Sequence, residues 1–248
     1  MRLKSALLFM SAVLAFNANL AHANLIKNGG FEANVIDKSH IVNGKFIETD
    51  GITINNWTSS KDGGDSGGYN FLMNSSNAHL HGGAMRLQGD NEKENFFKSP
   101  SGGNFFASDP DYGPGTLKQL VNGLEVGTTY HLTFEYALAQ QYDWKKVDNT
   151  DVWWEVGFGN ALQDTTKLSI GPGEFSGWQK ATMSFTATST DQWLSFLSQR
   201  TNAGGPPFML LDNVQLHSEV PEPATGALML AGLGMIGFMA RRRRNGQA

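Results

Sequence analysis

The sequence predicts a single all-β domain of about 195 residues with a targeting segment at each end of the chain. Helical periodicity is nearly absent between Asn24 and Ser218, and short runs of alternating apolar and polar residues recur there instead. Clusters of Gly, Asn, Asp and Pro separate these runs. This combination is typical of a β-sandwich or a β-barrel.

Four runs carry the strand prediction. In three of them the apolar side chains recur with a period of two, and the fourth, 208–216, is nearly continuously apolar. In the run 128–137 (TTYHLTFEYA), Tyr130, Leu132, Phe134 and Tyr136 share one face. The other three runs are 151–159 (DVWWEVGFG), 181–188 (ATMSFTAT) and 208–216 (FMLLDNVQL).

About nine or ten strands fit this length, and the part between residues 34 and 98 is the least regular. We assign no strands there but expect its Trp57 to pack in the core. Trp178 and Trp193 stand at the beginnings of strands, and we expect both to pack as well. The acidic residues of "SDPDYG", Asp109 and Asp111, are expected to lie in a solvated turn.

The first 23 residues form a secretory signal peptide. A basic start (MRLK) precedes an apolar stretch over 6–16, and the Ala-His-Ala sequence at 21–23 is an A-x-A cleavage site. We therefore expect cleavage between Ala23 and Asn24, with the Sec translocon and signal peptidase as partners.

The chain ends in a short apolar segment followed by four arginines. As a helix, residues 226–240 would be roughly 22 Å long, which is short of the roughly 30 Å hydrocarbon core of a bilayer. Each arginine costs about 2.5 kcal/mol or more inside the membrane, so export should stop there. We expect a marginal membrane contact that leaves residues 24–218 outside the cytoplasm. The arginines are Arg241, Arg242, Arg243 and Arg244.

Charge and cysteine content exclude several functions. Between Asn24 and Ser218 there are 13 Lys and Arg against 21 Asp and Glu, a net charge of −8. An acidic domain is a poor partner for nucleic acid, whose binding depends on neutralising phosphates. The chain has no cysteine, which excludes disulfides, catalytic thiols and Cys-ligated zinc.

The tail resembles the PEP-CTERM sorting signal of Gram-negative bacteria. Its Pro221, Glu222 and Pro223 precede the apolar segment and the arginines in the order typical of that signal. The two prolines oppose a helix and keep the backbone extended and accessible. The resemblance implies recognition by an exosortase, transient anchoring in the inner membrane, and delivery to the cell surface or an exopolysaccharide matrix.

The domain resembles, more loosely, the jelly-roll sandwiches of galactose-binding-like carbohydrate-binding modules. The matching pieces are 24–32 (NLIKNGGFE), 117–137 and 208–216. In such sandwiches a glutamate after the first strand and an aspartate before the last often bind a structural calcium ion. The resemblance places these roles on Glu32 and Asp212. Their carboxylates suit calcium, which prefers oxygen ligands, although both residues have the alternative of capping strand ends.

A sugar-binding surface requires exposed aromatic rings, which stack on the apolar faces of sugars. Trp153 points opposite to Trp154 in an alternating strand, and Tyr142 and Trp144 lie in the polar run "QQYDWKK". These three residues, Tyr142, Trp144 and Trp153, are the predicted platform, although each has the alternative of covering the core from an edge.

Catalysis has less support in the sequence. Two of the strand-borne carboxylates Glu135, Glu155 and Asp151 would form a glycosidase pair only if they faced each other at about 5–10 Å. His79 and His81 would share a strand face but have no obvious third metal ligand. We assign no catalytic residue.

The sequence thus predicts three segments: a signal peptide (1–23), a jelly-roll β-sandwich (24–218) and a sorting signal with a hydrophobic helix (219–248). The predicted function is non-catalytic polysaccharide binding at the cell surface or in the matrix. The alternatives are a structural or adhesive matrix protein without a sugar pocket, and a small carbohydrate-active enzyme.

Overall fold

The computed structural model describes most of the central region of the chain and five residues of the tail. The chain divides into two compact units, one formed by residues 23–219 and the other by residues 1–22 and 220–248. The described residues are 23–36, 41–42, 46–48, 52–59, 70–74, 87, 97–111, 114–141, 149–201, 205–218 and 232–236.

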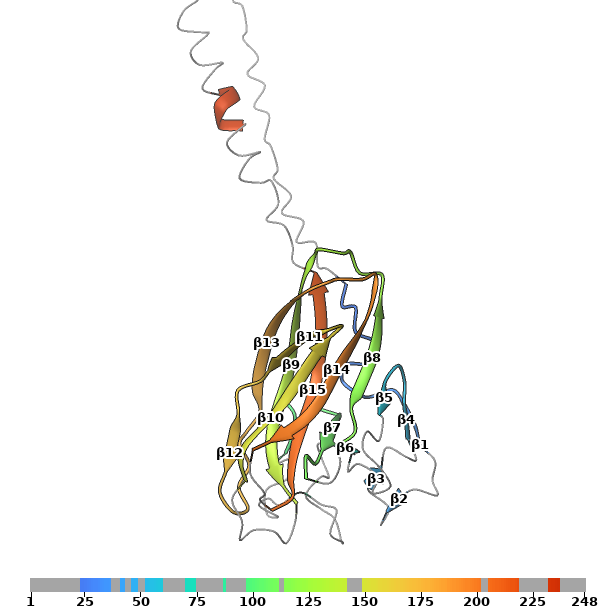
Figure 1. Ribbon diagram of the computed structural model, residues 1–248, viewed down its shortest axis with the longest axis vertical. Helices are drawn as coiled ribbons and strands as arrows, with labels where there is room; N and C mark the ends of the chain where they lie inside the picture. Colours follow the sequence, from blue (N-terminus) through green and yellow to red (C-terminus); the bar gives the residue numbers. More distant parts are fainter. Residues whose placement is uncertain are drawn as a thin grey trace, which may run out of the picture. The chain divides into compact units, whose positions relative to one another are not determined.

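Two antiparallel sheets face each other and form a β-sandwich (Figure 1). The first sheet has seven strands in the order β13-β9-β15-β7-β6-β3-β2. Its strands are β13 (Gln179–Thr186), β9 (Thr129–Gln140), β15 (Pro207–Ser218), β7 (Asn104–Ser108), β6 (Asn70–Asn74), β3 (Phe46–Glu48) and β2 (Ile41–Val42).

The second sheet has six strands in the order β11-β10-β14-β8-β5, with β12 also pairing with β10. A separate two-stranded sheet joins β1 and β4. The strands are β11 (Ala161–Asp164), β10 (Asn149–Phe158), β14 (Asp191–Arg200), β8 (Leu117–Asn122), β5 (Thr58–Ser59), β12 (Leu168–Ile170), β1 (Asn34–Ile36) and β4 (Ile52–Ile54).

The chain passes back and forth between the two large sheets. β8 lies in the six-stranded sheet, β9 in the seven-stranded sheet and β10 in the six-stranded sheet again, and β13, β14 and β15 continue the alternation. This crossing produces a jelly roll and confirms the predicted all-β sandwich.

The described residues form fifteen strands rather than nine or ten. The difference arises from β1 to β6, which have two to five residues each and are too short for alternation to reveal.

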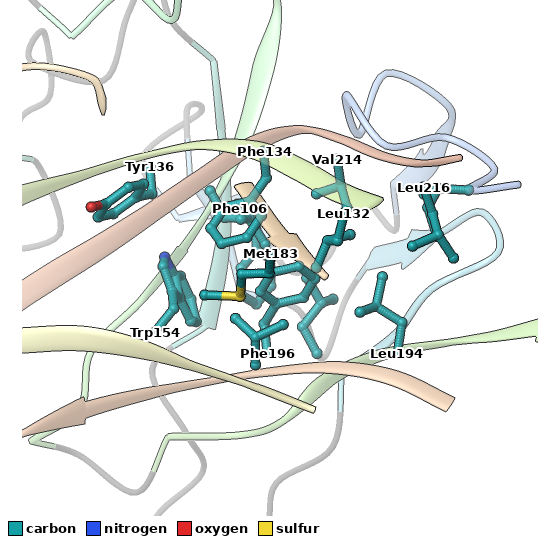
Figure 2. Packing of buried hydrophobic residues seen from close by; sticks show 14 of the residues in the cluster. Phe106, Leu132, Phe134, Tyr136, Trp154, Met183, Leu194, Phe196, Val214 and Leu216 are labelled. Atoms are coloured by element: carbon teal, nitrogen blue, oxygen red, sulfur yellow. The ribbon is translucent and has the colours of Figure 1, made fainter. Parts of the chain in front are cut away.

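The main core fills the space between the two large sheets. Trp154, Phe196 and Phe106 are fully buried there, and the rings of Trp154 and Phe196 meet edge to face at 6.1 Å (Figure 2). The four alternating residues of β9 that were predicted to face inward belong to this core. They are Tyr130, Leu132, Phe134 and Tyr136. Trp57 is 6% exposed and packs against Phe31 and Phe196, which confirms its predicted place in the core.

A second apolar cluster covers part of the outer face of the seven-stranded sheet. Ala137, Ala139 and Leu210 lie on this face because they alternate with residues of the main core. Phe97 packs with them, and Phe175 and Trp178 lie against the cluster. The expectation that Trp178 packs is therefore confirmed.

The segment after the predicted cleavage site runs along the last strand, β15. The Leu25 amide donates to the Leu216 carbonyl at 2.9 Å, and the Val214 amide donates to the Gly29 carbonyl at 3.0 Å. A Cβ atom at Gly29 would collide with the carbonyl oxygen of Val214, so this close approach requires glycine. The pairing brings the first residues of the domain beside its last strand.

In the described part of the tail, residues 232–236 are helical. Among the described residues there is no helix with the length and apolar character needed to cross a bilayer. The predicted sorting residues, from Pro221 to Pro223 and from Arg241 to Arg244, lie outside the described residues.

Candidate ligand-binding surface and metal site

The outer face of the six-stranded sheet carries the one residue of the predicted platform that the structure describes, Trp153. Trp154 is fully buried in the core, so its neighbour Trp153 points to the outer face and is half-buried there. The ammonium of Lys167 lies 4.3 Å from the centre of the Trp153 ring. The indole nitrogen of Trp153 is buried without a hydrogen-bond partner among the described residues. Tyr142 and Trp144 lie outside the described residues, so the platform as a unit stays a prediction.

A second tryptophan on the same outer face is more open than Trp153. On β14, Gln192, Leu194 and Phe196 are buried, so Trp193 between them points to solvent. Its side chain is 46% exposed, and its register partner Leu120 on β8 is 41% exposed. The expectation that Trp193 packs is therefore wrong. The alternation with Leu194 and Phe196 contained the signal that places Trp193 outside.

Trp193 and Leu120 line a hollow of about 400 Å³, called the Trp193 hollow below. Amide and hydroxyl groups line much of the rest, and Lys27 is its one charged lining residue among those described. The complete lining is Lys27, Ile54, Asn56, Trp57, Thr58, Gln119, Leu120, Asn122 and Trp193.

Fixed hydrogen bonds shape this hollow. The Gln119 side chain accepts from the Lys27 amide and donates to the Lys27 carbonyl, both at 2.8 Å. The Trp57 indole nitrogen donates to the Asn28 carbonyl at 2.9 Å. The Gln119 bonds hold the N-terminal segment against β8, and the Trp57 bond holds it against the residues before β5. Together they fix the wall that carries Lys27.

Of the predicted metal residues, Asp212 lies on the seven-stranded sheet and Glu32 in the N-terminal segment before β1. Asp212 on β15 is fully buried and pairs in register with Glu135 on β9. Its pKa is raised to about 7, chiefly by burial, while the Ser99 and Asn213 hydrogen bonds lower it and the charges of Glu135 and Glu32 raise it further. Glu32 is therefore close enough to Asp212 for its charge to act on that carboxylate. Sequence reasoning did not include Glu135 in this group.

Hydroxyl and backbone amide groups donate hydrogen bonds to these carboxylates. The Ser99 hydroxyl donates to Asp212, and the Ser101 hydroxyl donates to Glu135 at 3.0 Å. The Asn104 amide donates to Glu32 at 2.6 Å. In the described part of the chain, no three acidic, histidine or cysteine side chains are arranged to hold one metal ion together.

Two residues beside the predicted metal residues have left-handed backbone conformations. Phe31 has a φ of 59° and Asn213 a φ of 50°, and both residues adjoin a predicted metal residue. A left-handed conformation is rare for a bulky residue such as Phe31. A Cβ atom at Gly103, which has a φ of 66°, would collide with the Glu32 carboxylate. The loop at Gly103 therefore requires glycine to admit Glu32.

Asp109 does not lie in a solvated turn, as expected from the sequence. It is fully buried, and its Oδ1 accepts from the Asp111 amide at 2.7 Å. Arg200 on β14 forms an ion pair with Asp111. Burial raises the pKa of Asp109 to about 8, although the Arg200 charge opposes the shift. The expected solvated turn is therefore wrong for Asp109, which is fully buried, and for Asp111, whose side chain is mostly buried against Arg200.

Glu135 and Glu155 do not form a glycosidase pair. Glu135 alternates with core residues of β9 and lies on the outer face of the seven-stranded sheet. Glu155 alternates with Trp154 and Val156 and lies on the outer face of the six-stranded sheet. The whole sandwich separates Glu135 from Glu155. His79 and His81 lie outside the described residues.

Comparison with known proteins identifies the tail. Residues 219–244 match the family model described as the PEP-CTERM protein-sorting motif. The predicted sorting signal is confirmed, and it indicates an exported, surface-targeted protein.

A curated relative aligns with most of this chain, but the alignment covers only a small part of the relative. Halomucin of Haloquadratum walsbyi is 27% identical over 213 residues, which are 85% of this chain and 2% of halomucin. The chain thus spans a very small part of that relative.

The similar solved structures are distant. A cyclase from Fischerella sp. TAU has a TM-score of 0.49 and 18% identity, over 79% of this chain and 97% of the cyclase. TmCBM61, solved in complex with β-1,4-galactotriose, has a TM-score of 0.40 and 17% identity, over 79% of this chain and 99% of TmCBM61. A putative sugar binding protein from Bacteroides thetaiotaomicron has a TM-score of 0.41 and 13% identity, over 79% of this chain and 100% of that protein. At these scores the similarities decide neither ligand nor activity, and the sandwich rests on the chain's own sheets.

Proposed function

We propose that this protein binds polysaccharide, without catalysis, through the outer face of its six-stranded sheet after export. A signal peptide delivers the chain to the Sec translocon, and an exosortase handles its tail. In this proposal the cell is Gram-negative, the anchoring in the inner membrane is transient, and the protein acts at the cell surface or in an exopolysaccharide matrix.

The observation that carries the proposal is the exposure of Trp193 at the Trp193 hollow. An exposed tryptophan beside Leu120 gives an apolar surface on which a sugar ring stacks. The side chains of Asn56 and Asn122 supply hydrogen-bond donors and acceptors that orient sugar hydroxyls. An apolar surface with a few fixed polar groups is the usual composition of a small-ligand site.

The second part of the proposal is a structural calcium ion at Glu32 and Asp212. The donors suit calcium, because Glu32 and Asp212 offer carboxylates and Ser99 offers a hydroxyl beside Asp212. The mutual repulsion of these carboxylates is a reason to expect a cation, although Lys180 lies opposite Glu135 in the register of β13 and β9. Bound calcium would neutralise the buried carboxylate of Asp212 and join the first residues of the domain to its last strand.

The binding proposal is tested by retention of the exported protein on immobilised exopolysaccharide from the producing organism. Trp193→Ala should weaken retention roughly fivefold or more, since a stacked aromatic contributes about 1 kcal/mol. Leu162→Ala is the matched control, because Leu162 is 63% exposed on β11 of the same sheet and does not line the hollow.

Two results would contradict this assignment. If the native protein is not retained, the polysaccharide-binding function is wrong. If Trp193→Ala binds normally while a folded variant lacking Tyr142, Trp144 and Trp153 does not, the predicted platform is the binding surface and the hollow is not.

A further inference from the structure

We propose that the Trp193 hollow binds an acidic sugar, so that the ligand is a polysaccharide whose rings carry carboxylates. This inference rests on the proposed function, because it takes the hollow as a sugar site and adds the charge of its ligand. It is carried by the charges that surround the hollow in an otherwise acidic domain.

Two lysines contribute positive charge at the hollow. Lys27 is exposed and lines it directly. Lys118 lies on β8 opposite Thr58, which is also a lining residue, and its ammonium is 5.3 Å from the centre of the Trp193 ring. Lys27 thus borders the hollow, and the Lys118 charge lies over the ring of its exposed tryptophan.

No carboxylate belongs to the described lining of the hollow. Over residues 24–218 the acidic side chains outnumber the basic ones by 21 to 13. A sugar site without acidic lining residues, bordered by two lysines, therefore has a local charge opposite to that of the domain as a whole. This charge favours an anionic ligand and opposes a cationic one.

Asp191 marks the limit of the positive region. It pairs in register with Asn122, a lining residue, and its carboxylate accepts a hydrogen bond from the Thr190 hydroxyl at 3.3 Å. Asp191 therefore lies at the end of the hollow away from Lys118, which pairs with Ser195 four residues along β14. The ligand's carboxylate should face Lys27 and Lys118 rather than Asp191.

The remaining lining groups specify a sugar rather than a simple anion. Trp193 offers a flat apolar surface, and the amides of Asn56 and Asn122 suit hydroxyl groups. A lysine ammonium recognises a carboxylate as a point charge and does not require planar pairing. A uronic acid residue combines these features, because one ring carries an apolar face, several hydroxyls and a carboxylate.

The test uses the full exported protein and pairs of polymers that differ only in charge. Alginate, polygalacturonate and hyaluronan are each compared with a carboxyl-reduced form of the same polymer. At least one acidic polymer should bind, and its reduced partner should bind more than about tenfold more weakly. Lys27→Gln and Lys118→Gln should each weaken binding of the acidic polymer up to about fivefold. Lys98→Gln is the matched control, because Lys98 is exposed on the loop over the other sheet.

Each outcome decides the inference. Equal binding of an acidic polymer and its reduced partner overturns the acidic-sugar assignment and leaves the proposed function intact. Failure of every acidic and reduced polymer to bind overturns the acidic-sugar assignment, and failure to bind the native exopolysaccharide as well overturns the proposed function too. Binding of acidic polymers that is indifferent to Lys27→Gln and Lys118→Gln, or equally sensitive to Lys98→Gln, places the charge recognition elsewhere and also overturns the inference.

Discussion

Asp212 and Glu135 lie directly opposite each other on β15 and β9, with both carboxylates on the outer face of the seven-stranded sheet. Like charges directly opposite in an antiparallel pair destabilise it. Here the pair is joined by the nearby charge of Glu32 and is partly buried under the loop that carries Ser99. A cation bound at Glu32 and Asp212, as proposed, would relieve this repulsion.

The first prediction concerns calcium at these carboxylates. Chelation with EDTA should lower the Tm, and calcium should restore it, whereas magnesium should restore little because it prefers smaller octahedral sites. At a hundredfold excess over Kd, bound calcium adds about 2.7 kcal/mol to the free energy of unfolding. Because the pKa of Asp212 is about 7, protons compete with calcium below neutral pH. The effect of EDTA should therefore be larger at pH 8 than at pH 6.

Asp212→Asn should abolish the response to EDTA and calcium while leaving the protein folded. Asp164→Asn is the matched control, because Asp164 is an exposed carboxylate on β11 of the other sheet. A Tm that does not change after exhaustive removal of metal would show that the calcium proposal is wrong.

The second prediction concerns the buried carboxylate of Asp109. Burial raises its folded pKa to about 8 from an ordinary value of 3.8, so the folded protein holds a proton that the unfolded chain releases between these values. The stabilisation from this proton is complete below about pH 4 and is lost as the pH rises to about 8. The free energy of unfolding in EDTA should therefore fall by at least about 1 kcal/mol between pH 5 and pH 8.5.

Asp109→Asn should reduce this loss, because the amide keeps the acceptor for the Asp111 nitrogen and carries no charge. Urea denaturation at the two pH values measures the difference between the variant and the native protein. The residual slope should come from Asp212, whose pKa is raised in the same direction. An identical pH slope in Asp109→Asn and the native protein would contradict the assignment.

The sequence predicted the long strands well because their alternation is strong. In β9 and β10, aromatic and aliphatic residues such as Phe134 and Trp154 recur with a period of two, and all of them enter the core. β1 to β5 were not predictable, because two or three residues cannot show a period. Their strand character depends on pairing with distant segments.

The candidate sites were predictable only in part. Glu32 and Asp212 could be named through family resemblance, but their neighbour Glu135 required the register of β9 with β15. Trp193 could have been placed outside from the alternation of β14, in which Leu194 and Phe196 face inward. The burial of Asp109 was not readable locally, because "SDPDYG" has the composition of an exposed turn.

The third prediction concerns the contact between the N-terminal segment and β15. Gly29→Ala places a methyl group against the Val214 carbonyl and should disturb the hydrogen bond from the Val214 amide to the Gly29 carbonyl. The free energy of unfolding should fall by about 1–3 kcal/mol. Gly30→Ala is the matched control, because a Cβ atom there would meet only the Asp212 carboxylate, at an ordinary 3.7 Å. Measurement in EDTA separates this effect from calcium binding, and equal stability of the two variants would contradict it.

The last prediction concerns processing of the tail. The matched sorting motif spans residues 219–244, and an exosortase substrate should lose the apolar segment and the arginines after export. Because proline opposes helix formation, we expect the break near Pro221 to Ala224. Intact-mass analysis of the protein released from the cell surface should show a chain that begins at Asn24 and ends near this motif.

Replacing Arg241 to Arg244 with glutamine should reduce processing, because it removes the positive charge that is expected to hold the tail on the cytoplasmic side. Recovery of released protein that still ends in Gln247-Ala248 would show that the tail serves only as an anchor.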